Sequence, residues 1–150
     1  MTDFVRMREL IRLEERYRWA LERQMAKATK ITASISQAGK TGGGKTGSQV
    51  EENAVILAEI RSQHEEIEKE LDEMRDELRG TLKRLRSEKV KLEKNILKLR
   101  YMKGISVRKI ANTLNYSEDY MFQKMKQAEA LIINMQRTQE HRRKKTVHLG

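Results

Sequence analysis

Apolar residues recur at every third or fourth position along most of the chain, which is the spacing of amphipathic α-helices. Residues 3–29 form the first such segment, and Asp3 is placed to cap its N-terminus. A second series, regular over residues 57–78, alternates steps of three and four, as a coiled coil or helical hairpin does. We therefore expect residues 1–86 to form a helical hairpin or coiled-coil scaffold, whose apolar stripes also allow a homodimer. The first stripe consists of Leu10, Leu13, Tyr17, Leu21, Met25 and Ala28.

The second stripe contains one polar residue, His64. A histidine at such a position is a pH switch, a metal ligand, or a polar residue that sets the register of the paired helices or lies at the edge of the seam. The last role is the commonest, and we adopt it. The other members of the stripe are Leu57, Ile60, Ile67, Leu71, Met74 and Leu78.

Residues 30–49, between the two stripes, are rich in Gly, Ser and Thr and predict a flexible linker. Within them GKTGGGKT (39–46) matches the phosphate-binding P-loop pattern. A working P-loop needs a preceding strand and a second strand ending in Asp that holds Mg²⁺. The chain lacks the near-continuous apolar strands of a parallel sheet. We therefore attribute the match to linker composition and expect no enzyme, no cofactor and no metal site.

The pattern changes near residue 80, where the regular seam is lost. We place a break or bend between residues 80 and 88, with Gly80 near it and Ser87 as a candidate N-cap. Shorter helices are then expected over about 88–102, 107–114 and 118–132. Their boundaries are marked by Gly104, Ser106, Asn115 and Ser117.

Two short helices joined by a tight turn, with the small Ala111 where they cross, predict a helix-turn-helix domain over residues 87–135. The alternative is a three-helix cap whose outer face is merely solvated. The predicted core of the domain consists of Leu92, Ile96, Leu99, Ile110, Leu114, Tyr116, Met121 and Met125.

Charge divides the chain into two parts. Residues 1–80 hold 14 Lys/Arg and 16 Asp/Glu, whereas residues 81–150 hold 18 Lys/Arg and 6 Asp/Glu. A basic half joined to a near-neutral half indicates a polyanion-binding module on a scaffold. The basic tail 136–150 is either a disordered arm that adds phosphate affinity or a solubilising end.

The helix that follows Ser117 is expected to enter the major groove of DNA. Gln123 suits adenine and Lys124 suits guanine or phosphate, while Arg108 and Lys109 are placed to bind phosphate. The residues that we assign to DNA binding are Arg108, Lys109, Ser117, Tyr120, Gln123, Lys124 and Lys126.

One pattern within residues 92–132 consists of Leu99-Arg100-Tyr101, Gly104, Ser106, Ile110-Ala111, Leu114, Ser117 and Ala128. This pattern resembles the fourth conserved region of bacterial sigma factors. The resemblance implies a helix-turn-helix that reads promoter DNA and contacts RNA polymerase. With the long helical N-terminal half, the chain resembles the phage-encoded sigma-like late transcription regulators of the RinA/ArpU type, which implies an activator of phage late genes.

A small terminase-type DNA-packaging subunit is the alternative, because it also joins a helix-turn-helix to oligomerising helices. A ring of many subunits favours packaging, and a monomer or dimer favours transcription. Cysteine is absent, and no apolar run approaches the ~18 residues of a membrane span. We therefore expect a cytoplasmic protein with no membrane involved. The predicted helix-turn-helix and the resemblance to sigma factors imply double-stranded promoter DNA and host RNA polymerase as its partners.

Overall fold

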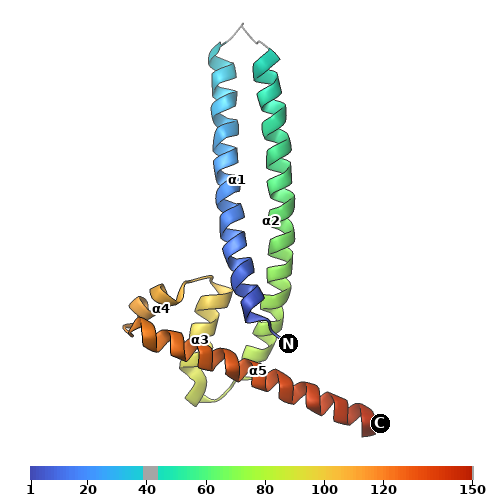
Figure 1. Cartoon of the computed structure of the whole chain (residues 1–150), viewed down its shortest axis with the longest axis vertical. Coiled ribbons are helices and arrows are strands. Elements are labelled where there is room, and N and C mark those ends of the chain that lie inside the picture. Colours follow the sequence, from blue (N-terminus) through green and yellow to red (C-terminus); the bar gives the residue numbers. More distant parts are fainter. Residues whose placement is uncertain (39–43, 150) are drawn as a thin grey trace. The chain divides into compact units, whose positions relative to one another are not determined.

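The computed structural model describes residues 1–38 and 44–149, with side chains described for 1–30 and 48–145. The described residues form helices and no strand, as the all-α prediction requires. Two short elements flank α3, namely a 3₁₀ turn η1 (Glu88–Val90) and a π-helical turn η2 (Lys98–Met102). The five α-helices are α1 (Phe4–Ala38), α2 (Gly44–Arg84), α3 (Lys91–Leu97), α4 (Val107–Leu114) and α5 (Glu118–Leu149) (Figure 1).

The two long helices extend into the predicted linker. Helix α1 continues to Ala38 and α2 begins at Gly44, so most of residues 30–49 belong to helices. Residues 30–38 contain neither Gly nor Pro, so no strong helix breaker ends α1 at the predicted position. Residues 39–43, at the start of the P-loop match, lie outside the described residues. The segment before them is helical, whereas a P-loop requires a strand there.

The C-terminal boundaries also differ from the prediction. Helix α5 continues through the predicted tail to Leu149, since neither Gly nor Pro interrupts residues 118–149. Helix α2, in contrast, passes through Gly80 and ends at Arg84, so the break at residues 85–87 falls within the predicted interval 80–88 and confirms it. Ser87 caps the next turn, where its Oγ accepts a hydrogen bond from the Lys89 backbone N–H at 3.3 Å.

The chain divides into two compact units, Arg12–Glu70 and Met1–Ile11 with Leu71–Gly150. The predicted boundary after residue 86 therefore does not coincide with the division of the structure. The reason is that apolar residues from α1 and α2 pack in the same core as those of the predicted helix-turn-helix domain. The largest fully buried side chains of this unit are Met7, Leu10, Leu71, Leu78, Leu82, Ile96, Leu97, Tyr101, Ile110, Met121 and Ile132.

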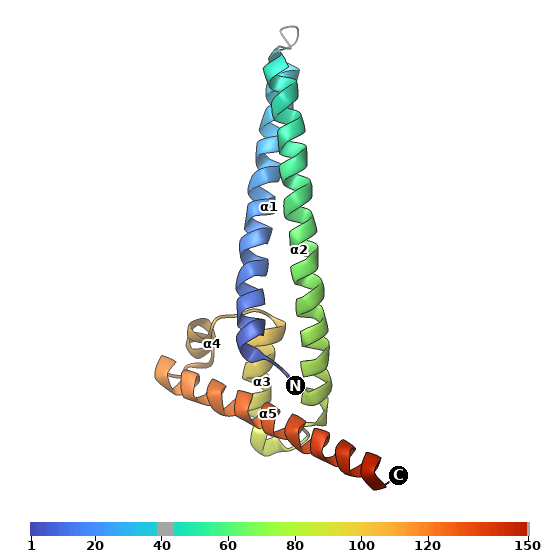
Figure 2. The ribbon, with the colours of Figure 1, turned by 45° about the vertical axis from the view of Figure 1, so that its right-hand side comes forward.

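In the unit Arg12–Glu70, α1 and α2 run antiparallel side by side (Figures 1 and 2). Two polar contacts fix their alignment. The side-chain amide of Gln24 donates to Asn53 Oδ1, and His64 Nε2 lies 3.4 Å from Glu14 Oε1. His64 Nε2 also lies 3.4 Å from Glu68 Oε1. His64 therefore contacts carboxylates from both helices, an arrangement that fits a role in setting register and also fits the metal-ligand alternative.

In the other unit, Gln136 is the centre of a buried polar network. Its Oε1 accepts a hydrogen bond from the Thr2 backbone N–H at 2.7 Å. Its Nε2 donates to the hydroxyl oxygens of Thr2 and Thr81, at 2.8 and 3.1 Å. All three residues are buried. The network therefore joins the N-terminus of the chain to α2 and α5.

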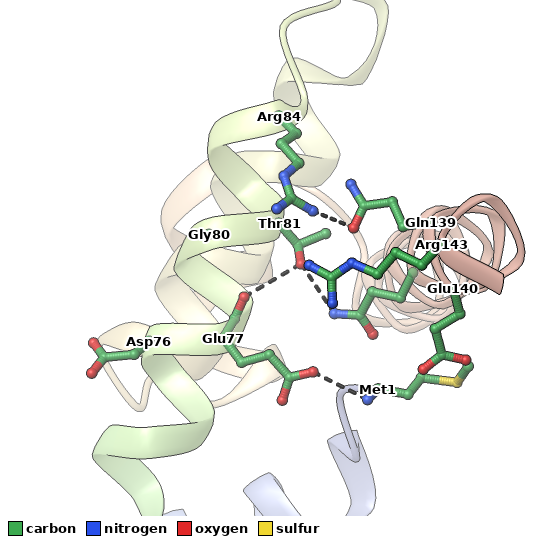
Figure 3. Close-up of a pocket in the computed structure, with 10 residues that line it drawn as sticks. Met1, Asp76, Glu77, Gly80, Thr81, Arg84, Gln139, Glu140 and Arg143 are labelled. Atoms are coloured by element: carbon green, nitrogen blue, oxygen red, sulfur yellow. Dashed lines mark hydrogen bonds and ion pairs between the residues drawn. The ribbon is translucent and has the colours of Figure 1, made fainter. Parts of the chain in front are cut away.

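Solvent-accessible ion pairs and hydrogen bonds border this network. The N-terminal amino group lies 3.2 Å from Glu77 Oε1, and Arg84 donates to the side chain of Gln139 (Figure 3). These contacts link the same three segments, but at an exposed or half-exposed surface. They contribute less than the buried network, because water competes for exposed polar groups.

We predict that Gln136→Ala lowers the free energy of unfolding by about 1–3 kcal/mol, because it leaves the buried Thr2 N–H without an acceptor. Urea denaturation followed by circular dichroism measures the loss. Gln139→Ala is the matched control on the same helix, and we expect it to cost well under half as much. Equal losses for the two variants would contradict the anchoring role of the buried network.

Candidate nucleic-acid interface

Local capping signals set the ends of α4 and the start of α5. Ser106 Oγ accepts from the Lys109 N–H at 3.3 Å, and Ser117 Oγ accepts from the Tyr120 N–H at 3.2 Å. Asn115 ends α4 in the left-handed conformation, with φ at 61°. The predicted caps are thus confirmed, and three residues, 115–117, connect the two helices.

Small and apolar residues fill the space between α4 and α5. Ile110 and Ala111 of α4 are buried, as are Met121, Met125 and Ala128 of α5. Helix α3 adds Ile96 and Leu97 to the same core. The three helices therefore pack around one core and leave one side of α5 facing solvent.

The prediction that Tyr116 is a core residue is wrong. Its side chain is 41% exposed and stacks on Tyr120, with ring centroids 4.9 Å apart. The left-handed residue Asn115 turns the chain between the helices, and Tyr116 follows that turn onto the surface. Leu92, Leu99 and Leu114 are only half-buried.

The structure places most of the predicted DNA-binding residues at the surface of α4 and α5. Arg108 and Lys109 lie exposed in the first turn of α4, and Arg108 Nε lies 3.6 Å from a carboxylate oxygen of Glu118. Ser117 is exposed, and its hydroxyl oxygen caps α5. Tyr120, Gln123 and Lys126 are exposed on α5.

Lys124 differs from the other predicted contacts, because it is half-buried against α3. Its Nζ lies 3.0 Å from Glu93 Oε1. The hydrogen bond from Lys124 to Glu93 raises the pKa of Lys124. Burial pushes the pKa of Glu93 upward, but a backbone hydrogen bond and Lys124 outweigh it and lower that pKa. Both groups are therefore charged at neutral pH, and the ion pair holds Lys124 toward α3.

A second polar cluster fixes α5 from another side. Arg8 Nη1 lies 2.9 Å from both Tyr101 Oη and Glu129 Oε1, and the Tyr101 hydroxyl donates to Glu129. Burial, together with Glu129, raises the pKa of Tyr101, so the phenol stays a neutral donor. The ring of Phe4 packs against Tyr101 with centroids 4.9 Å apart. Sequence reasoning missed Arg8 and Glu129, because no local pattern relates them.

Comparison with known proteins finds no matching family model, curated protein or solved structure. The proposed function therefore rests on the residues of this chain. Among the described residues, none of the helices combines the length and the apolar character that a membrane crossing needs.

We predict that Asn115→Ala lowers the free energy of unfolding by about 1–2 kcal/mol, because a Cβ-bearing residue without a local polar side chain disfavours the left-handed conformation. Asn115→Gly should be near neutral, since glycine adopts positive φ without steric cost. Denaturant unfolding of the two variants measures the difference. If the alanine variant were as stable as the glycine variant, backbone strain at this turn would not limit stability.

Proposed function

We propose that α4, residues 115–117 and the first half of α5 form a helix-turn-helix that binds duplex DNA sequence-specifically. The observation that carries the proposal is the composition of one exposed surface. This surface combines cationic groups in the first turn of α4 with an amide, a phenol and an amine on α5. The buried residues of α3, α4 and α5 form the core that supports it. The exposed residues are Arg108, Lys109, Tyr120, Gln123 and Lys126.

Gln123 is the residue that we propose reads a base. It lies near the N-terminal end of α5, between the buried positions Met121 and Met125, and its own side chain is exposed. A carboxamide at this place in a recognition helix pairs bidentately with adenine in the major groove. Tyr120 and Lys126 lie near it and suit base or phosphate contacts.

Arg108 and Lys109 position the helix on the phosphate backbone. The ion pair between Arg108 and Glu118 is exposed and therefore weak, so a phosphate oxygen can replace the carboxylate. Phosphate contacts of this kind set orientation and carry no sequence information.

The resemblance of residues 92–132 to the fourth sigma region extends the proposal. It favours promoter DNA as the target, with host RNA polymerase as a protein partner. On this basis we propose a cytoplasmic transcription regulator that activates phage late genes. Recovery of bound fragments from the genome that encodes the chain tests this directly. Fragments without a shared sequence would overturn specific binding, and a shared sequence away from promoters would overturn the regulatory role.

A small terminase-type packaging subunit is the second candidate. It uses the same DNA contacts but assembles many copies of the chain. The pair of long antiparallel helices in the unit Arg12–Glu70 (Figure 1) is the observation that favours it, because a packaging subunit joins its helix-turn-helix to oligomerising helices.

We predict that Gln123→Ala weakens binding to the selected site more than to random DNA, with a loss of discrimination of about 1–3 kcal/mol. Arg108→Ala should weaken both alike and lower the slope of log K against log salt by about 0.9. Fluorescence anisotropy over a salt series measures both effects. Gln139→Ala, farther along the same helix, is the control. Identical behaviour of the first two variants would remove the base-reading assignment.

We predict that Glu93→Gln strengthens DNA binding several-fold at low salt. The substitution releases Lys124 from its ion pair and removes one carboxylate from the neighbourhood of α5. If Lys124 then contacts phosphate, the salt slope steepens by about 0.9. Glu88→Gln, which removes an exposed carboxylate from η1, is the matched control. An equal gain for both variants would show that Lys124 is not the residue released.

A further inference from the structure

One histidine and two glutamates meet between the paired helices of the unit Arg12–Glu70. Glu14 belongs to α1, whereas His64 and Glu68 are neighbours on α2, because residues four positions apart share one face of a helix. A ring nitrogen of His64 and one carboxylate oxygen of each glutamate all lie within 4.8 Å of one another. We call these three residues the His64 cluster. Side chains on facing helices build metal sites in helical bundles in the same way.

The distances within the His64 cluster suit the ligands of one metal ion. His64 Nε2 lies 3.4 Å from Glu14 Oε1 and 3.4 Å from Glu68 Oε1. Zinc binds nitrogen and oxygen at about 2.0–2.1 Å, which places the ligands of a tetrahedral site about 3.3–3.4 Å from each other. Two of the three distances between ligand atoms therefore match already. The third, between the two carboxylate oxygens, is at most 4.8 Å, and a rotation of the exposed Glu68 side chain closes it.

A hydrogen-bonded ion pair accounts for these distances less well. A charged nitrogen and a carboxylate oxygen that share a hydrogen bond approach each other to about 2.7–2.9 Å. Both glutamate oxygens face the same nitrogen of His64, and one ring nitrogen carries at most one proton. That proton serves one short hydrogen bond, so the second carboxylate gains little. The lone pair of a neutral imidazole, in contrast, is a metal ligand.

Burial and charge also favour a divalent cation at the His64 cluster. The side chains of His64 and Glu14 are only 13% and 20% exposed. Two carboxylates that converge in such a place repel each other, and their partial burial is unfavourable unless their charge is compensated. One divalent cation cancels both charges while the imidazole stays neutral. Because Glu68 lies at the exposed edge, water can supply the fourth ligand.

Arg18 competes for one carboxylate of the cluster. Its Nη1 lies 3.8 Å from Glu14 Oε1, which is the oxygen that also faces His64. The Arg18 side chain is exposed, and an ion pair of this kind is weak because water and salt screen it. A divalent cation can therefore displace the guanidinium, which turns into solvent.

We propose that Glu14, His64 and Glu68 bind one Zn²⁺ ion, with water as the fourth ligand. The ion joins α1 to α2 and so stabilises their pairing. Zinc fits better than Mg²⁺ or Ca²⁺, because these two ions prefer six or more oxygen ligands whereas imidazole suits transition metals. The proposal departs from our expectation of no metal site, since 50 positions separate Glu14 from His64 and no local pattern relates them. It does not depend on the proposed DNA contacts of α4 and α5.

Calorimetric titration of the full chain with ZnCl₂, after treatment with EDTA and dialysis, tests the proposal. We expect one Zn²⁺ per chain, with an affinity that excess Mg²⁺ does not change. Glu14→Gln, His64→Gln and Glu68→Gln should each lower that affinity more than about tenfold, because even the loss of a group that only orients a ligand costs about this much. Glu65→Gln, which removes an exposed carboxylate next to His64 in the sequence, is the matched control and should bind like the wild type.

Thermal unfolding followed by circular dichroism separates zinc binding from a role in register alone. Zinc should raise the Tm of the wild type, because a ligand that binds only the folded state stabilises it. The same addition should leave the Tm of His64→Gln unchanged. If His64 only sets the register, the substitution lowers the Tm equally with and without zinc, and the wild type does not respond to the metal.

Arg18→Gln tests the identity of the carboxylate oxygen. Removal of the competing cation should raise the affinity for zinc a few-fold. An unchanged or lower affinity would contradict the assignment of Glu14 Oε1 as a ligand.

Three further results would overturn the proposal. The first is the absence of zinc binding by the wild type. The second is binding that is lost in a variant with His141→Gln and His148→Gln but kept in His64→Gln, which would assign the ion to α5. The third is a rise in mass above that of the 17.7 kDa chain when zinc is added, measured by light scattering, which would assign the ion to a contact between copies. The base-reading role of Gln123 is measured separately and survives any of these results.

Discussion

The oxygen and the nitrogen of a buried side-chain amide both need hydrogen-bond partners. This requirement determines how the segments of the unit that carries the proposed interface pack together. Among the described residues, Gln136 meets it through Thr2 and Thr81, which lie far from it in the sequence. The N-terminal segment is therefore part of the core that supports α5. The cluster of Arg8, Tyr101 and Glu129 repeats the same arrangement nearer to α4. Since unpaired buried polar groups are costly, both clusters favour one position of α5 over others that would bury similar apolar area.

This support determines what the exposed side of α5 can do. A recognition helix reads bases only if its side chains start from a fixed backbone, because hydrogen bonds to base edges tolerate little displacement. The buried residues Met121, Met125 and Ala128 fix one side of α5, so Gln123 projects from the other. Lys124 lies between these two sides and is held by Glu93. The sequence alone predicts that Lys124 is available to DNA, whereas in the structure its ion pair with Glu93 holds it toward α3.

The sequence predicts features that depend on a few neighbouring residues. Ser106 and Ser117 act as N-caps, and Asn115 adopts positive φ, because the groups that each satisfies lie within three or four positions. The sequence does not predict the polar networks, since nothing local relates Thr2 to Gln136. Helix length is also poorly predicted. Residues 30–38 and 136–149 have no strong breaker, and their moderate helix propensities leave the ends to tertiary context.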